Sequence, residues 1–238
     1  MSSVVFNNNE SDIAKDGKGD AYVKVARSKI DTLRSVNKDN AEKIYDDVAR
    51  EYDSIVEAIY YNAPVLTTNA IRGVELSKEA AILDIGCGTG LVGVEMGKHG
   101  YKNMYGLDLS DESLKVAAEK GVYSRTVQAN FDGNCRLDFP DGYFDVVTST
   151  GCFVPGHLNG DSVPEMIRLT KPGGHLVLTI REKCFEEGRG GINLKSTLID
   201  LVQEGKISKV RHERGLYSID NTEGGSESQG LGLVYRVL

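Results

Sequence analysis

The sequence predicts an α/β protein built on one mostly parallel sheet of seven strands. Between residues 80 and 180, short apolar runs alternate with stretches whose apolar residues recur every three or four positions. Such alternation with short connections is typical of parallel strands joined by crossover helices. Two further strand patterns follow residue 205. We therefore expect helices on both faces of the sheet and an antiparallel strand at the C-terminal end.

Composition and charge narrow the class of protein. The chain has 238 residues and a formal net charge of −7, without a run of lysine and arginine. An acidic surface has no long-range attraction to phosphate backbones, so we expect no nucleic-acid partner. The four cysteines form no Cys-x-x-Cys pair, and we expect no metal site. No apolar run has the length of a membrane span or signal peptide, which predicts a cytoplasmic protein without membrane contact.

The chain divides into a tail and one domain. Residues 1–20 are polar and are expected to be a flexible tail. Residues 21–238 are expected to form the domain, with N-terminal helices over 21–75, a ligand-binding core over 80–180, and a C-terminal helix with edge strands over 181–238.

The N-terminal part predicts three helices that would cover the core as a lid. Apolar residues fall at helical spacing from about Ala21, and again from Ile44 to Ile59. Pro64 suits the first turn of a helix and begins the third.

The core and the C-terminal part predict the remaining elements. Ser110 is the expected N-cap of a helix that Gly121 ends, and residues 172–174 form a turn. The expected core strands cover residues 81–85, 103–108, 122–129, 144–149 and 175–180, and core helices follow Leu91, Ser110 and Pro164. Beyond the core we expect a helix over 193–204 and an antiparallel pair of edge strands, 207–219 and 231–238, joined by the loop 221–229.

A glycine-rich turn follows the first core strand. Gly86, Gly88 and Gly90 let the backbone approach a ligand, and the next helix presents free N–H groups. Residues 88–93 also satisfy the dinucleotide pattern G-x-G-x-x-G. Asp84, inside the strand before the turn, would repel a pyrophosphate but suits the cationic end of S-adenosylmethionine (SAM). The alternative is that Asp84 only caps local backbone.

A second acidic residue ends the next strand. Asp108 lies 22 residues after Gly86, where an acid commonly accepts hydrogen bonds from both hydroxyls of a ribose. Ser110 and Asp111 already serve the N-terminus of the following helix, which favours the ribose role for Asp108. A ribose acceptor suits NAD as well as SAM.

Four segments together resemble the motifs of class I SAM-dependent methyltransferases. They are Leu-Asp-Ile-Gly-Cys-Gly-Thr-Gly at 83–90, Gly-Leu-Asp-Leu-Ser at 106–110, Phe-Asp-Val-Val at 144–147 and Lys-Pro-Gly-Gly at 171–174. Residues 45–53, 63–64 and 151–157 are further similar to the methyltransferase-like proteins of the Williams–Beuren chromosomal-region type. The resemblance implies a Rossmann-like fold, SAM as cofactor and S-adenosylhomocysteine as product.

The resemblance also implies a set of cofactor-binding positions. The glycine turn would wrap the methionine part, Asp108 would hold the ribose, and Leu109 would pack on the adenine. Asn130 stands where the family often has aspartate, and its amide oxygen can still accept a hydrogen bond. The implied cofactor-binding residues are Tyr45, Tyr52, Asp84, Gly86, Cys87, Gly88, Gly90, Asp108, Leu109, Asn130, Phe131, Thr150 and Gly151. For Tyr45 and Tyr52, packing in the core is the alternative, because they share one face of the predicted helix.

Methyl transfer requires alignment of the acceptor, and an acceptor that carries a proton also needs a base. His157 follows the fourth strand on the side where the site opens, and it is the candidate general base. The alternative is a loop histidine with local hydrogen bonds only. Cys152 lacks a basic neighbour in the sequence and is expected to pack. Residues 149–153 contain no Asn-Pro-Pro-Tyr-like motif, which disfavours the adenine, cytosine and glutamine amide N-methyltransferases that this motif marks.

The sequence thus predicts a SAM-dependent methyltransferase that acts on a nitrogen, oxygen or sulfur atom of a small-molecule acceptor. Two other interpretations stay open. One is a non-catalytic SAM-binding or scaffold protein, which would bind the cofactor without turnover. The other is an NAD(P)-dependent oxidoreductase, for which the chain lacks a Tyr-x-x-x-Lys or comparable hydride-transfer set.

Overall fold

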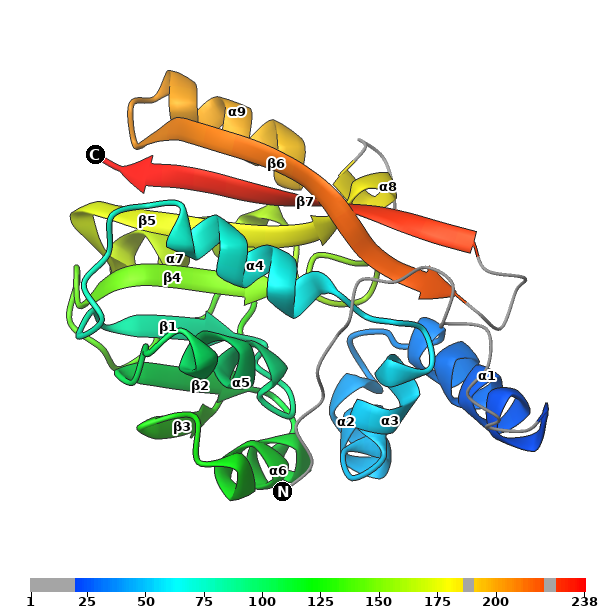
Figure 1. The fold of residues 1–238 in the computed structure, drawn as a ribbon. Helices are drawn as coiled ribbons and strands as arrows, with labels where there is room; N and C mark the ends of the chain where they lie inside the picture. Colours follow the sequence, from blue (N-terminus) through cyan, green and yellow to red (C-terminus); the bar gives the residue numbers. More distant parts are fainter. Residues whose placement is uncertain (1–19, 186–190, 221–225) are drawn as a thin grey trace.

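The computed structural model describes residues 20–185, 191–220 and 226–238 (Figure 1). The expected flexible tail, residues 1–20, lies outside these ranges except for Asp20, which begins the first helix. Among the helices in the described ranges, none combines the length and the apolar character needed to cross a membrane.

One seven-stranded sheet organises the molecule, with the strand order β3-β2-β1-β4-β5-β7-β6. Its strands are β1 (Ile82–Ile85), β2 (Met104–Asp108), β3 (Arg125–Gln128), β4 (Phe144–Thr150), β5 (Thr170–Arg181), β6 (Ile207–Asp220) and β7 (Ser226–Val237). The first five strands pair in parallel, and β7 runs antiparallel to both β5 and β6. The predicted fold class is confirmed, with β7 lying between β5 and β6.

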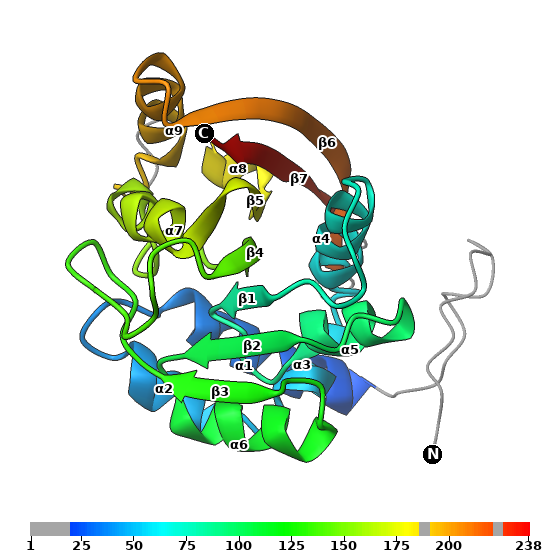
Figure 2. The ribbon, with the colours of Figure 1, turned by 90° about the vertical axis from the view of Figure 1, so that its left-hand side faces the viewer.

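Helices cover both faces of this sheet (Figure 2). They are α1 (Asp20–Arg34), α2 (Ala41–Val48), α3 (Tyr52–Glu57), α4 (Ala63–Arg72), α5 (Leu91–Lys98), α6 (Asp111–Lys120), α7 (Val163–Leu169), α8 (Glu182–Phe185) and α9 (Leu194–Gln203), with a 3₁₀ turn, η1 (Gly160–Ser162). On one face, Ile71 of α4 and Met96 of α5 pack with Ile82 of β1. On the other face, Met166 of α7 and Leu198 of α9 belong to a larger apolar cluster. Because both faces are covered, a ligand site has to lie at the ends of the strands rather than on a face of the sheet.

The helices α1, α2 and α3 gather beyond the carboxyl ends of β1 and β2 (Figure 1). They have a small core of their own, in which Ile30, Val48 and Ile55 are buried together. The single helix predicted from Ile44 to Ile59 is wrong, because the structure has two helices, α2 and α3. Between them, N–H groups bond three residues back, as from Glu51 to the Val48 carbonyl at 2.9 Å. This tighter turning ends the α-helical ladder at Val48.

Two local predictions in the core show how side chains and glycines set the boundaries. The Ser110 hydroxyl accepts a hydrogen bond from the Ser113 N–H, and Gly121 ends α6 with a φ of 63°, so both predicted caps are confirmed. The predicted turn at residues 172–174 lies within β5. There the register against β4 jumps, with Thr170 opposite Phe144 and His175 opposite Val146, so that the intervening residues bulge out of the ladder.

Candidate functional site

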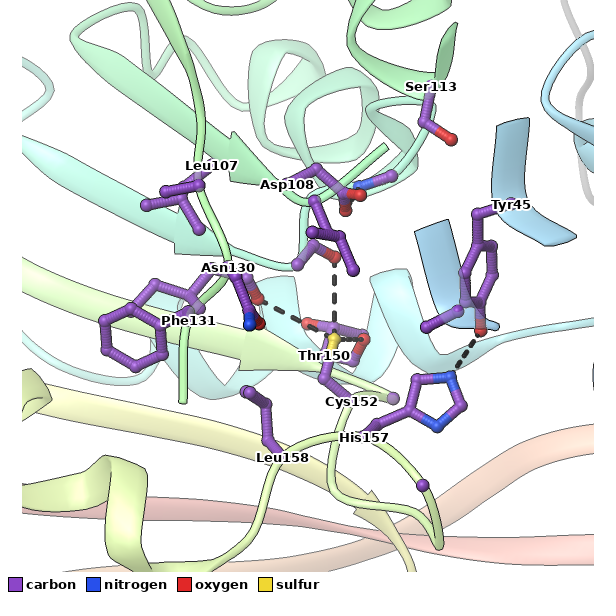
Figure 3. A pocket seen from close by; sticks show the side chains of 18 of the residues that line it. Tyr45, Leu107, Asp108, Ser113, Asn130, Phe131, Thr150, Cys152, His157 and Leu158 are labelled. Carbon is purple, nitrogen blue, oxygen red and sulfur yellow. Dashed lines mark hydrogen bonds between the residues drawn. The ribbon is translucent and has the colours of Figure 1, made fainter. Parts of the chain in front are cut away.

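A cavity of about 1070 Å³, its open mouth included, lies between the carboxyl ends of β1, β2 and β4 and the helices α2 and α3 (Figure 3). This is where parallel α/β sheets bind ligands. Ten of the predicted cofactor residues line it: Tyr45, Tyr52, Gly86, Gly88, Asp108, Leu109, Asn130, Phe131, Thr150 and Gly151. The candidate base His157 lines the same cavity. Asp84, Cys87 and Gly90 do not line it, although Cys87 reaches a smaller adjoining pocket together with Thr89.

The glycine turn keeps one stretch of backbone bare toward the cavity. Gly88 has a φ of +51°, and a Cβ added there would meet nothing within 4 Å. Gly86 has a φ of +71°, and a Cβ there would collide with the Cys152 sulfur. Gly90, by contrast, faces Ala117 and Tyr123, away from the cavity. The turn therefore leaves room for a ligand at Gly88, while Gly86 and Gly90 are constrained by neighbouring side chains.

Asp108 is held by backbone on both of its oxygens. Oδ2 accepts a hydrogen bond of 2.8 Å from the Gly88 N–H, and Oδ1 accepts one of 2.9 Å from the Ser110 N–H. Burial raises the pKa of the carboxyl group, and these backbone hydrogen bonds oppose that rise. The carboxylate is thus fixed in the cavity wall with lone pairs left to accept from a ligand.

Asp84 is fully buried, and its side chain points from β1 toward Tyr123 rather than into the cavity. Its Oδ2 accepts a hydrogen bond of 2.6 Å from the Tyr123 hydroxyl, and its Oδ1 has no partner among the described residues. Burial raises the pKa of Asp84 to about 7, although the Tyr123 bond lowers it. Gly106 makes room for this contact, since a Cβ there would crowd the Tyr123 ring. Asp84 therefore lies behind the glycine turn rather than in the cavity.

The part of the cavity wall at the end of β4 contains small polar side chains. The Thr67 hydroxyl lies 2.7 Å from the hydroxyls of both Thr150 and Thr179, which ties α4 to β4 and β5. Burial raises the pKa of Cys152 to about 12, so this thiol stays protonated at neutral pH. That protonation state agrees with the predicted packing role of Cys152 and argues against a nucleophilic one.

Tyr61 and Tyr217 bring two hydroxyls to Gly151. Their rings meet edge to face with centroids 5.3 Å apart, and a Cβ on Gly151 would run into both hydroxyls. No sequence pattern marks Tyr217 as a site residue, because it comes from β6, far along the chain. Two residues further along β6, the N–H of Ile219 donates to the Ile59 carbonyl at 2.8 Å, and this long-range hydrogen bond holds β6 beside the segment that follows α3.

His157 and Tyr45 meet across the cavity (Figure 3). His157 Nε2 lies 2.7 Å from the Tyr45 hydroxyl oxygen, and Nδ1 lies 3.1 Å from the Pro155 carbonyl oxygen. A carbonyl only accepts, so Nδ1 carries the proton and Nε2 accepts from Tyr45. Burial lowers the pKa of His157, which keeps the ring neutral and leaves Nε2 unprotonated. The geometry therefore supplies an acceptor nitrogen beside the reaction space.

The fold and the cavity define a class of protein. Residues 83–178 match the family model described as a methyltransferase domain. This segment runs from the glycine turn and Asp108 to β5, and so contains most of the cavity wall described above. Over residues 83–178 the chain is therefore similar to methyltransferase domains, and the cofactor that such a domain implies is SAM.

Two curated relatives show similarity over about 150 residues. Methyltransferase-like protein 27 of Homo sapiens is 38% identical over 149 residues, covering 60% of this chain and 59% of the relative. The demethylmenaquinone methyltransferase of Geobacillus stearothermophilus is 28% identical over 153 residues, covering 60% of this chain and 63% of the relative. The chain thus matches about three fifths of the length of these relatives.

Solved structures share the fold at low sequence identity. The [4+2]-cyclase SpnF superposes with a TM-score of 0.62 at 17% identity, covering 85% of this chain and 96% of SpnF. A SAM-dependent methyltransferase from Mesorhizobium loti superposes with a TM-score of 0.53 at 16% identity, covering 71% of this chain and 95% of that one. Both likenesses establish the Rossmann-like methyltransferase fold.

Proposed function

We propose that this chain transfers the methyl group of SAM to a nitrogen, oxygen or sulfur atom of a small-molecule acceptor and releases S-adenosylhomocysteine. One observation carries the proposal. A single cavity joins the Asp108 carboxylate, the bare backbone at Gly88 and the His157–Tyr45 pair. A cofactor held at the first two would extend toward the third. The likeness to Methyltransferase-like protein 27 supports the activity, and placement in the Williams–Beuren group is part of this proposal.

The residues present fit SAM at its nucleoside end. Asp108 has both oxygens anchored by backbone N–H groups and faces the cavity, as an acceptor for two ribose hydroxyls would. Leu109 and Phe131 line the next part of the wall and offer apolar surfaces for the adenine. Asn130 lies beside them and would accept from the adenine amino group through its amide oxygen.

The methionine end fits as well. The space in front of Gly88, where any side chain would project, is open. Asp84 has a buried oxygen without a hydrogen-bond partner among the described residues, directly behind the turn that contains Gly86 and Gly88. A cationic amino group near the turn would be stabilised by that carboxylate through the backbone or a bridging water. Cys87 and Gly90 would contribute through the shape of the turn rather than by contact.

When bound, SAM supplies an electrophilic methyl group for in-line displacement. The chain's residues then have to orient the acceptor, exclude water and accept a proton. Thr150 and Gly151 line the cavity beyond the glycine turn, and Tyr52 closes it from the lid. His157 Nε2 would take the acceptor's proton when the acceptor replaces the Tyr45 hydroxyl at that nitrogen, with Nδ1–H held by the Pro155 carbonyl. Such a base is worth about 10²–10⁴-fold in rate.

A small organic acceptor agrees with the walls of the cavity and with the charge of the chain. Tyr45, Tyr52 and Tyr61 line the reaction end, and a net charge of −7 offers no attraction to nucleic acid. The name of one group of relatives states a small organic substrate, demethylmenaquinone. We infer that this chain likewise acts on a small molecule rather than on a macromolecule.

Calorimetric titration with SAM, S-adenosylhomocysteine and NAD tests the cofactor. We expect SAM and S-adenosylhomocysteine to bind and NAD not to bind. Binding of NAD without binding of SAM would overturn the proposal. Incubation with methyl-labelled SAM and fractionated metabolite extracts then tests turnover. Label transferred to a small molecule is expected, whereas label found only in added protein or RNA would contradict a small-molecule acceptor.

A second candidate is a SAM-binding protein that does not transfer the methyl group. The observation in its favour is that the SpnF structure, whose fold this chain shares, is named as a cyclase. This candidate predicts tight SAM binding with no label released to any acceptor.

A further inference from the structure

The lid helices contain the pair Tyr-Asp twice, at residues 45–46 and 52–53. In each pair the tyrosine lines the cavity. The aspartate of each pair instead accepts hydrogen bonds from the α/β core. The two aspartates therefore determine where the two tyrosines sit over the cavity.

Asp46 binds the N-terminus of α6. Its Oδ1 accepts hydrogen bonds from the Ser110 hydroxyl at 2.6 Å and from the Glu112 N–H at 3.2 Å. The backbone N–H of the same Ser110 donates to Asp108 at 2.9 Å. One serine thus contacts the lid through its side chain and the ribose acceptor through its backbone.

Asp53 binds the glycine turn itself. Its Oδ1 accepts a hydrogen bond of 2.6 Å from the Thr89 hydroxyl, and its Oδ2 accepts one of 2.6 Å from the Lys120 ammonium. Lys120 also donates to the Thr89 carbonyl at 2.7 Å, which closes a three-residue ring of hydrogen bonds. The lid is therefore fastened to the residue that follows Gly88.

The hydrogen bonds of Asp46 and Asp53 both reach segments that hold Asp108. Its two oxygens are held by the N–H groups of Gly88 and Ser110. Asp53 holds Thr89, the neighbour of Gly88, and Asp46 holds Ser110 itself. A movement of the lid would therefore shift both backbone segments that orient the Asp108 carboxylate.

We propose that Asp46 and Asp53 are positioning residues that couple docking of the lid, residues 41–57, to binding of the cofactor. This inference rests on the proposed function, in which that cofactor is SAM. A docked lid orders the two loops that hold SAM, and SAM on those loops keeps the lid docked. Because coupling between two binding events is reciprocal, each strengthens the other by the same factor.

The chain offers a matched control in Asp47. This carboxylate lies next to Asp46 on the same helix, is exposed, and pairs with Lys43 four residues earlier. Asp47→Asn therefore removes the same charge from α2 without breaking a contact to the cofactor loops.

Hydrogen exchange of the protein without SAM tests lid docking directly. Asp46→Asn and Asp53→Asn should accelerate exchange of the amides in residues 41–57, while the amides of β1, β4 and β5 keep their wild-type rates. Asp47→Asn should match the wild type throughout. Equal acceleration in the lid and in the sheet would attribute the effect to global stability and overturn the positioning role.

Calorimetry with SAM tests the coupling. Asp46→Asn and Asp53→Asn should each weaken SAM binding by about tenfold, within the range usual for coupled sites, and Asp47→Asn should not. Added SAM should slow lid exchange in the wild type and slow it less in the two variants. Unchanged SAM affinity in both variants would overturn the proposal.

Lys120→Met is a second way to weaken the contact between the lid and the glycine turn, and it leaves the lid sequence unchanged. It removes the cation from the ring around Thr89, so it should accelerate lid exchange in the same direction as Asp53→Asn, and the double variant should show less than the sum of the two effects. Strict additivity would contradict the ring. A wild-type protein that binds no SAM would overturn the proposed function, while lid exchange in the variants would still decide the docking role of the aspartates.

Discussion

The hydroxyl of Tyr45 lies 2.7 Å from Nε2 of His157, so the lid and the loop after β4 meet through a basic nitrogen. The Pro155 carbonyl holds the opposite ring nitrogen and selects the tautomer. This arrangement keeps His157 neutral and aimed at the cavity without a carboxylate partner among the described residues. Substitutions of His157 should therefore change turnover, whereas substitutions of the cofactor-binding residues should change SAM affinity.

His157→Gln should lower turnover by about 10²–10⁴-fold while SAM affinity stays near the wild-type value. Glutamine keeps hydrogen-bonding groups near Tyr45 but has no basic nitrogen. Steady-state kinetics with the identified acceptor, paired with calorimetry, makes the measurement. Tyr45→Phe is the control, because it removes the hydrogen bond and leaves the base. Wild-type turnover in His157→Gln would exclude this histidine as the base.

The same histidine predicts a loss of stability in acid. Burial lowers the pKa of His157 in the folded protein, so the unfolded chain binds the proton more tightly. Its contribution to stability is therefore complete above about pH 6.5, the ordinary histidine value, and is lost as the pH falls below it. Urea unfolding of the wild type and of His157→Gln between pH 5 and 8 should converge toward the acid end. Parallel curves would show that burial of His157 does not contribute.

Asp108→Asn should weaken SAM binding by about 1.5–3 kcal/mol, because it replaces a charged acceptor by a neutral amide. The Asn side chain can still accept the Gly88 or the Ser110 N–H, so the fold should persist. Calorimetry gives the affinity, and thermal unfolding in the absence of SAM is the control. An affinity equal to that of the wild type would remove Asp108 from the ribose site.

Asp84 predicts a pH dependence of opposite sign. Its pKa of about 7 lies above the ordinary value of about 3.9, so the folded state binds the proton more tightly. The stability from this group is full below pH 3.9 or so and declines as the pH rises toward 7. Asp84→Asn should remove that decline. The free energy of unfolding of Asp84→Asn, measured with urea, should therefore rise relative to that of the wild type from pH 5 to pH 8. A constant difference would contradict the raised pKa.

The same titration should appear in cofactor binding. Ionisation of Asp84 above pH 7 should strengthen binding of cationic SAM, and Asp84→Asn should abolish this rise. Tyr123→Phe removes the hydrogen bond that lowers the pKa of Asp84, so the midpoint should move to higher pH. A midpoint that stays in place in Tyr123→Phe would assign the titration to another group.

Gly86→Ala and Gly88→Ala should separate fold from ligand binding. Both positions have positive φ, which costs an alanine about 1–2 kcal/mol. Gly88→Ala meets no neighbour, so beyond that cost it should act on SAM binding. Gly86→Ala meets the Cys152 sulfur, so Cys152→Ala should restore part of its stability. Additive losses in the double variant, measured by thermal unfolding, would contradict the clash.

The sheet and the cofactor wall could be predicted because local patterns encode them. The glycine turn, Asp108 and the cap at Ser110 each depend on residues close in sequence, and the structure brings these elements to one edge of the sheet. The sequence predicts that Asp84, inside the strand before that turn, serves the cationic end of SAM. Strand geometry turns its side chain to the opposite face, toward Tyr123, which no local pattern reveals.

The contacts of the lid could not be predicted in the same way. Helical periodicity continues through residues 44–59 because Val48 and Ile55 share one small core, and so it conceals the break between α2 and α3. Asp53 meets Thr89 and Tyr217 meets Gly151 only after the sheet has formed. The repeat of Tyr-Asp at a spacing of seven residues was the available signal for the aspartates.

The position of β7 between β5 and β6 has a consequence for synthesis on the ribosome. Strand β6 carries Tyr217 to the reaction end of the cavity, yet β6 joins the sheet only through β7, which is translated after it. Until residues 226–237 emerge, the hydrogen-bonding edge of β5 stays open and β6 has no partner strand. The last strand of the chain is therefore the one that attaches β6, and with it Tyr217, to the sheet.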